Sequence, residues 1–198
     1  MGEGVQRKTK KRENILQAAE RLFLQKGIRS VSIEEIAKGA KASKTTLYKY
    51  FADKQEILEA FLQDISQSVL ERLEGIYEKG TKNGLTREDF LDIFDVEQYS
   101  YFFQSSFTTE LVSEFPSSVE KLYGWMQGRL IPLFHELVDM AKEQGIVRKE
   151  VDTEILITYS LLMRRNFTET PQIPSHMSMK EFTQKFYDLY LHGVVERD

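Results

Sequence analysis

The sequence predicts an all-α protein with a basic N-terminal head and a larger acidic helical domain. Apolar residues recur at helical spacing along most of the chain, and Ser, Thr or Asp residues stand at cap positions before these runs. Residues 1–54 hold 13 Lys and Arg against 6 Asp and Glu, a balance of +7. The remainder holds the other 14 of 27 basic and 25 of 31 acidic residues, a balance of −11. This asymmetry indicates a polyanionic partner at one end of the chain.

Composition argues against several other classes of protein. The chain has no cysteine, which excludes disulfides, thiolate zinc sites and cysteine nucleophiles. No apolar segment follows the basic N-terminus, and no run approaches the roughly 20 apolar residues of a membrane span. The three histidines show no metal-ligand spacing, and neither a nucleophile elbow nor a glycine-rich phosphate loop is present. We therefore expect a cytoplasmic protein that is not an enzyme and carries no metal or other cofactor.

The head is predicted to contain three helices followed by a long linking helix. The first runs from about Thr9 to Lys26 and stops at Gly27. A capping box, Ser32 to Glu35, opens the second helix. The third is expected over residues 43–51, and the linking helix continues to about residue 79.

The third helix is predicted to have two different faces. Leu47 and Phe51 are four residues apart and share an inward stripe, while Ser43 is a good N-cap. The opposite side carries cationic, hydroxyl-bearing and aromatic groups, which a DNA major groove accepts. Two short helices joined by a tight turn, the second with such a face, are typical of a helix-turn-helix. Taken alone, the same stretch also fits an ordinary solvated surface helix.

Residues 9 to about 60 resemble the DNA-binding head of the tetracycline-repressor (TetR) family of bacterial transcriptional regulators. The matching residues are Ile15, Ala18, Ala19, Leu22, Phe23, Gly27, Ser32, Ile36, Ala37, Ala40, Ser43, Leu47, Tyr48, Tyr50, Phe51, Lys54 and Leu58. The family usually has Ala-Gly-Val-Ser at the turn, where this chain has Ala40-Lys41-Ala42-Ser43. Lys41 therefore replaces a glycine of positive φ, at some energetic cost unless the turn geometry shifts.

The chemistry of the head and this resemblance together imply a set of DNA-binding residues. Lys44 and Thr45 are expected to read base edges, and Tyr48 to meet a sugar, a thymine methyl or a phosphate. The complete predicted set is Ser32, Ser43, Lys44, Thr45, Thr46, Tyr48, Lys49, Tyr50 and Lys54. Nearby Lys8, Lys10, Lys11 and Arg12 would add non-specific attraction. The alternative for each lysine is plain solvation, and for Ser32 and Ser43 it is capping without DNA contact.

The resemblance implies a nine-helix TetR-like fold, with residues 1–54 as the DNA-binding domain and 55–198 as a regulatory, ligand-binding and dimerisation domain. Caps and breakers predict helices over residues 86–95, 96–114, 117–144, 153–167 and from 179 onward. Pro132 is expected to kink the longest of these, because it cannot donate to the carbonyl of Gly128. Asp152 is the expected cap of the next helix.

The resemblance also implies that the last two helices form a dimer interface. Candidate interface residues are Ile155, Tyr159, Leu162, Phe186 and Tyr190; a monomeric core is the alternative. Aromatic and methionine residues supply material for an apolar ligand pocket, although most of them also fit plain core. Candidate pocket residues are Tyr99, Phe103, Phe107, Trp125, Phe134, Met163 and Phe167. Arg164 and Arg165 fit either an anionic ligand or an intersubunit ion pair.

The function implied is a ligand-responsive regulator of transcription, most commonly a repressor in this family. It would bind a palindromic DNA operator as a homodimer and be released by a small apolar or amphipathic inducer. The alternative is a helix-turn-helix adaptor that binds a protein instead of DNA.

Overall fold

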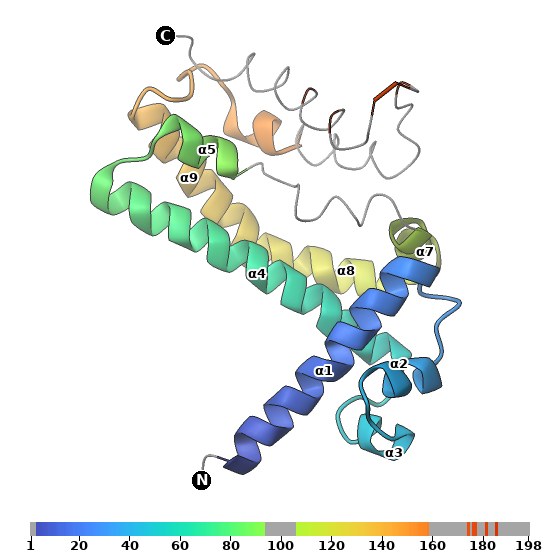
Figure 1. The fold of residues 1–198 in the computed structure, drawn as a ribbon. Helices are drawn as coiled ribbons and strands as arrows, with labels where there is room; N and C mark the ends of the chain where they lie inside the picture. Colours follow the sequence, from blue (N-terminus) through green and yellow to red (C-terminus); the bar gives the residue numbers. More distant parts are fainter. Residues whose placement is uncertain are drawn as a thin grey trace. The chain divides into compact units, whose positions relative to one another are not determined.

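The computed structural model describes residues 3–93 and 106–158 and the single positions 174, 176, 177, 181 and 185. In this part of the chain every element is helical, which confirms the predicted fold class (Figure 1). In order these are α1 (Glu3–Lys26), α2 (Ile33–Gly39), α3 (Lys44–Leu47), α4 (Lys54–Asn83), α5 (Arg87–Asp92), α7 (Ser106–Glu114), α8 (Pro116–Trp125), the π-helix η2 (Met126–Leu130) and α9 (Ile131–Glu143). A further helical stretch covers residues 153–158.

The chain divides into two compact units. Unit 1 comprises Met1–Gln67 and Tyr101–Gly124, and unit 2 comprises Ser68–Ser100 and Trp125–Asp198. The helix-turn-helix therefore packs as one body with α7 and most of α8, although these come from the region predicted to be regulatory. The functional boundary predicted after residue 54 is a different division, and it stays a prediction.

The core of unit 1 is organised by the apolar stripe of α1. Ile15 and Phe23 are completely buried, as the helical spacing predicted. The ring of Phe23 packs 6.4 Å from those of Phe61 and Phe107, and the latter two meet edge to face at 5.8 Å between centroids. Aromatic groups at these separations attract one another beyond their buried area. This cluster joins α1, α4 and α7, so α7 is part of the core of the head.

The start of α2 is set by local hydrogen bonds that the sequence predicted. The hydroxyl of Ser32 accepts from the backbone amide of Glu35 at 3.2 Å, and the carboxylate of Glu35 accepts from the amide of Ser32 at 2.9 Å. This reciprocal arrangement is the capping box. Lys26, the last residue of α1, donates to the same carboxylate at 2.7 Å. Together these contacts lower the pKa of Glu35 to about 2.

The turn between α2 and α3 keeps the geometry that the family's glycine would have. Lys41 has φ of 52°, the one positive value at a non-glycine residue among the described positions. The amide of Lys41 donates to Lys38 O, and that of Ala42 donates to Ala37 O. The turn has therefore not shifted to suit a lysine. The backbone of Lys41 is held in the left-handed region, which L-residues disfavour because their Cβ comes too close to the following carbonyl oxygen.

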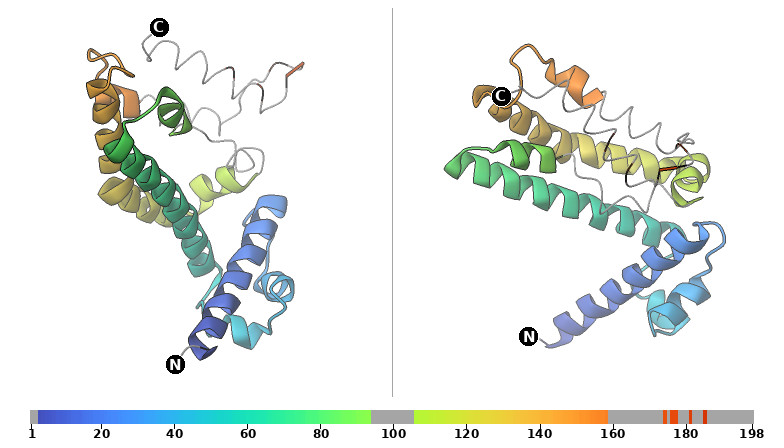
Figure 2. Two further views of the ribbon diagram at one scale, coloured as in Figure 1. Left: turned by 60° about the vertical axis from the view of Figure 1, so that its left-hand side comes forward. Right: turned by 45° about the horizontal axis from the view of Figure 1, so that its top comes forward.

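Unit 2 is built on the second half of α4, with α5 and α9 packed against it (Figures 1 and 2). Its core includes Leu73, Phe90, Leu137, Val138 and Val147. The helix predicted to begin after Thr86 is confirmed: Thr86 and Asp89 form a second capping box. Lys79 donates to Asp89 at 2.6 Å, and this bond is the main cause of the lowered pKa of Asp89.

The long helix predicted over residues 117–144 is observed as α8, a π-helical segment and α9, and this irregular segment directly precedes the turn that holds Pro132. Between α8 and α9 the chain forms the π-helix Met126–Leu130, and the amide of Ile131 donates to Met126 O, five residues back. Pro132 lies at the beginning of α9 and has no N–H to give to Gly128. An inserted π-turn accommodates this missing bond without breaking the helical run.

Two predicted helix starts in the C-terminal region had different outcomes. The helix predicted from residue 117 begins one residue earlier, at Pro116, whose fixed φ suits the first helical position. Asp152 does cap the next helix, accepting from the amide of Ile155 at 2.9 Å. The predicted segments at residues 96–105 and 159–173, and nearly all of the last helix, lie outside the described residues.

We predict that Lys41→Gly stabilises the head, because glycine adopts φ of 52° without steric cost. The gain in unfolding free energy should be about 1 kcal/mol, measured by urea denaturation. Lys38→Gly in the last turn of α2 is the matched control, and it should destabilise by a similar amount because its glycine enters a regular helix. Equal losses from both substitutions would contradict the assignment of strain to Lys41.

We also predict an acid-sensitive contribution from Glu35. Its folded pKa of about 2 lies below the ordinary value of 4.5, so its stabilisation is complete above pH 4.5 and is lost as the pH falls toward 2. Glu35→Gln keeps an acceptor oxygen but removes the charge. The difference in urea midpoint between wild type and this variant should be largest near neutral pH and shrink below pH 4. A difference independent of pH would contradict the electrostatic origin.

Candidate nucleic-acid interface

The third helix of the head is short and held from both ends. Ser43 caps α3 by accepting from the amide of Thr46 at 3.1 Å. Regular α-helix ends at Leu47, earlier than predicted. Tighter turns follow, in which the amides of Lys49 and Tyr50 donate to Thr46 O at 3.2 Å and to Leu47 O at 2.9 Å. Leu47 and Phe51 are both buried in the core of unit 1, as the stripe predicted. This burial orients the opposite side of α3 toward solvent.

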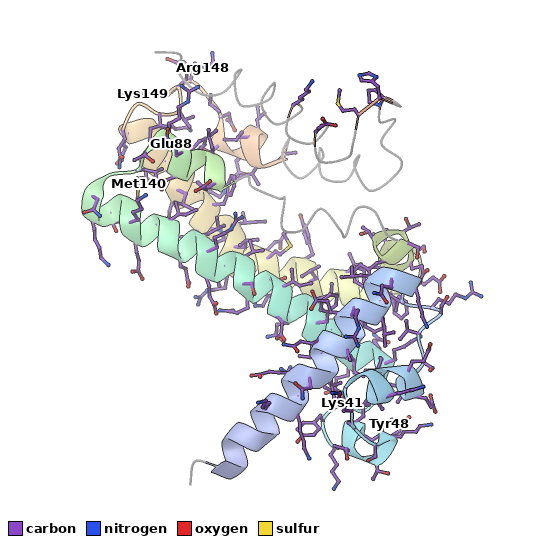
Figure 3. The ribbon with its side chains drawn as sticks, in the orientation of Figure 1. Lys41, Tyr48, Glu88, Met140, Arg148 and Lys149 are labelled. Carbon is purple, nitrogen blue, oxygen red and sulfur yellow. The ribbon has the colours of Figure 1, made fainter. Side chains whose placement is uncertain are left out.

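The solvent-facing side of α3 brings several predicted DNA-binding residues together. Lys44, Thr45, Tyr48 and Lys49 are all exposed. Figure 3 labels Tyr48 at the end of α3 and Lys41 in the preceding turn. The ammonium of Lys44 lies 6.0 Å from the centroid of the Tyr48 ring, within the range of a cation–π contact. The result is a small cationic and aromatic surface on a short helix.

Lys44 has a second partner that sequence reasoning missed. Its Nζ donates to Oε1 of Glu34, in the first turn of α2. The bond raises the pKa of Lys44 and lowers that of Glu34. The two residues are ten positions apart on different helices, so the i,i+4 spacing that reveals ion pairs within one helix does not reveal this one. Only the fold of the turn brings them together.

Four other predicted residues are partly engaged inside the protein. The hydroxyls of Ser43 and Thr46 are 2.8 Å apart. The hydroxyl of Ser32 donates to Glu35 at 3.0 Å within the capping box, and Tyr50 is half-buried against the core of unit 1. Ser32 and Ser43 therefore both have the capping role that was the stated alternative. Their contact with DNA stays a prediction.

Lys54 has internal hydrogen-bond partners that the sequence did not predict. Its ammonium donates to the carbonyls of Ile28 and Val31, each at 2.9 Å, and to that of Arg29 at 3.3 Å. An ammonium has three protons, so these three acceptors use its full donor capacity. Partial burial lowers the pKa of Lys54. Lys54 therefore fixes the loop between α1 and α2, and its contact with phosphate stays a prediction.

The same loop is held from its other side by α7. The amide of Arg29 donates to Oε2 of Glu110 at 2.7 Å, and its guanidinium lies 3.7 Å from Glu114. Gly27 closes α1 with φ of 78°, and a Cβ there would collide with the carboxylate of Glu110. The positive φ favours glycine at this position, and a Cβ would also push the Glu110 carboxylate away. The sequence indicated the first point but not the second.

The ligand and dimer predictions fall on both units and on undescribed residues. Phe107 is fully buried in the unit 1 core, where it serves packing. Trp125 and Phe134 are half-buried, and Phe134 packs on the core of unit 2. Ile155 is 68% exposed, as a free interface residue would be. Outside the described residues lie Tyr99, Phe103, Met163 and Phe167 of the predicted pocket and Tyr159, Leu162, Phe186 and Tyr190 of the predicted interface. The remaining pocket and interface assignments stay predictions.

The all-helical frame and the capped, cation-bearing α3 define a helix-turn-helix protein. Comparison with known proteins agrees: residues 15–61 match the family model described as bacterial regulatory proteins, tetR family. The resemblance of this part of the chain to the TetR family, predicted from the sequence, is thereby confirmed. Within the described residues, no helix combines the length and apolar character needed to cross a membrane.

Known proteins resemble this chain over different lengths, one relative in sequence and two solved structures in fold. An uncharacterised HTH-type transcriptional regulator of Bacillus subtilis, YvkB, is 42% identical over 72 residues, which are 35% of this chain and 37% of that protein. The chain thus matches little more than a third of that relative's length. A solved TetR-family regulator from Mesorhizobium loti is 18% identical with a TM-score of 0.68, covering 96% of this chain and 99% of its own. A TetR/AcrR-family regulator from Thermobifida fusca is 21% identical with a TM-score of 0.67, covering 92% and 97%. Both structures share the fold.

We predict that Lys54→Met destabilises unit 1 by about 1–2 kcal/mol, because three loop carbonyls lose their donor. Urea denaturation checks this loss. Lys49→Met, at an exposed position, is the control and should leave stability unchanged. If Lys54→Met were neutral for stability but weakened DNA binding as much as Lys49→Met, the phosphate role first predicted would be supported.

Proposed function

We propose that this protein is a ligand-responsive transcriptional regulator that binds duplex DNA through α2 and α3, most simply as a repressor. The observation that carries the proposal is the surface of α3: Leu47 is buried in the core, while Lys44, Tyr48 and Lys49 face solvent. A helix with this division can place side chains on base edges and phosphates in a major groove. The balance of +7 in residues 1–54 supports the same partner, because phosphates attract such a head without regard to sequence.

The residues proposed for DNA contact fall into two roles. Lys44 and Thr45, at the start of α3, are proposed to meet base edges, since lysine pairs with guanine and threonine contacts thymine. Tyr48 and Lys49 are proposed to meet the sugar-phosphate backbone and to fix the register. Thr46 and Tyr50 retain a proposed backbone contact beside their internal ones. Residues Lys10 and Lys11 of α1 are exposed and add non-specific attraction.

We propose that two copies of the chain act together on a palindromic operator. A single α3 offers few base contacts, and two-fold pairing places two such helices in successive major grooves, roughly 34–36 Å apart. Exposure of Ile155 supports a contact surface near the beginning of the helical stretch 153–158. The remaining interface and pocket residues named from the sequence complete this part of the proposal.

The inducer is proposed to be small and apolar or amphipathic, because the residues named for its pocket are aromatic or thioether side chains. Half-buried Trp125 and Phe134 are the described members of that set outside the core of unit 1. Such a ligand releases DNA only by binding the DNA-free conformation more tightly than the DNA-bound one. The coupling is therefore a difference between two affinities and needs no contact between inducer and DNA.

Direct measurement of DNA binding tests the proposal. We expect the purified chain to shift the duplex upstream of its own gene at low salt, with an affinity that falls steeply as salt rises. Lys49→Ala should weaken binding to all sequences alike. It should also reduce the slope of log affinity against log salt concentration (the salt slope) by about one unit. Lys44→Ala should instead relax the preference at one base position of each half-site.

The control variant is Lys82→Ala, which removes the same charge from a surface pair near the end of α4 in unit 2. It should change neither affinity nor salt slope beyond the effect of net charge. A uniform loss on every sequence for Lys44→Ala would assign it to the backbone. Failure of the wild-type chain to bind any duplex at low salt would favour the adaptor function, in which the head binds a protein.

A further inference from the structure

The ion pair between Glu34 and Lys44 lies on the surface proposed to meet DNA. Glu34 is in the first turn of α2 and Lys44 is the first residue of α3, so the pair crosses the turn of the helix-turn-helix. Both side chains face solvent, 60% exposed for Glu34 and 51% for Lys44. A carboxylate at such a place is unexpected, because it repels the phosphates that the rest of the head attracts.

The position of the lysine ammonium is restricted from two directions. The Glu34 carboxylate accepts its hydrogen bond, and the Tyr48 ring lies 6.0 Å from it. A lysine is otherwise a flexible point charge that turns readily toward any nearby phosphate. Held between a carboxylate on α2 and a ring on α3, Lys44 points across the exposed end of the motif. Its charge is locally cancelled, so this part of the surface adds little to sequence-independent attraction.

The Glu34–Lys44 pair complements a base edge better than it complements a phosphate. Guanine offers O6 and N7 as acceptors for the lysine, so a G·C pair can engage the ammonium that Glu34 holds in place. A phosphate can engage only the lysine, and its approach brings it close to the carboxylate. Discrimination by such a repulsive element is a recognised source of specificity.

We propose that Glu34 is a specificity-determining residue that positions Lys44 over base edges and keeps it away from phosphates. This inference rests on the proposed DNA-binding function and deepens it. Glu34 acts through Lys44, so it is a positioning residue. Its loss should increase non-specific binding and decrease selectivity, whereas loss of a residue that makes a favourable DNA contact weakens binding.

The test is a selection from a randomised duplex library, carried out with the full-length wild-type chain and with Glu34→Gln. The affinity of each protein for its selected duplex and for poly(dI–dC) is then measured over a range of salt concentrations. For Glu34→Gln we expect affinity for poly(dI–dC) to rise roughly 3- to 10-fold. The slope of log affinity against log salt concentration should steepen by about 0.9, which corresponds to one additional phosphate contact. The ratio of specific to non-specific affinity should fall by a similar factor, with weaker base preference at one position.

Two comparisons separate positioning from a general change in charge. Glu78→Gln removes the same charge from another exposed Glu–Lys pair, 3.3 Å from Lys82 in unit 2, and should leave the ratio unchanged. In a Lys44→Ala background, Glu34→Gln should no longer steepen the salt slope, because the lysine that it releases is absent. Equal thermal midpoints for wild type and Glu34→Gln would show that neither result comes from misfolding.

Each other outcome overturns the inference in a distinguishable way. Equal increases in specific and non-specific affinity mean that Glu34 acts only through net charge. An effect that persists without Lys44 means that Glu34 contacts DNA directly. A wild type that selects a sequence while Glu34→Gln behaves identically leaves the proposed function intact and removes the inference alone. A wild type that selects no sequence removes both.

Discussion

Burial of Leu47 and Phe51 in the core of unit 1 is the constraint on which the recognition surface depends. A helix of four residues cannot be stable alone, since nucleation costs more than its few hydrogen bonds return. Tertiary packing therefore holds α3, and the direction of that packing decides which side chains face outward. Ile15 and Phe23 of α1 belong to the same core, so α1 supports α3 as well as carrying basic residues.

A second layer of contacts fixes the backbone on which α2 and α3 stand. Lys54 binds three carbonyls of the loop between α1 and α2, while Glu110 of α7 binds an amide of the same loop. Both contacts satisfy backbone groups that a short irregular connection leaves without partners. Because α7 supplies one of them and also shares the Phe23–Phe61–Phe107 cluster, residues 106–124 pack with the head in unit 1.

Some basic residues of the head make internal hydrogen bonds, and others present their charge to solvent. Lys26, Lys44 and Lys54 each have an internal acceptor, whereas Lys49 lies exposed on the recognition side. A count of basic residues therefore overstates how many meet phosphate. The positive balance is typical of a head that attracts a polyanion, but the hydrogen-bonding partners of each lysine decide whether its charge is available to one.

The sequence by itself determined the helical class, the caps at Ser32, Thr86 and Asp152, the stop at Gly27 and the family of the head. These features depend on residues close together in the chain, where spacing and side-chain chemistry suffice. It also located the strain at Lys41, because only a missing glycine had to be noticed. The partners of Lys44 and Lys54, and the place of Phe107 in the head, needed the tertiary structure. Each joins groups ten or more residues apart, and local spacing carries no information about such contacts until the chain has folded.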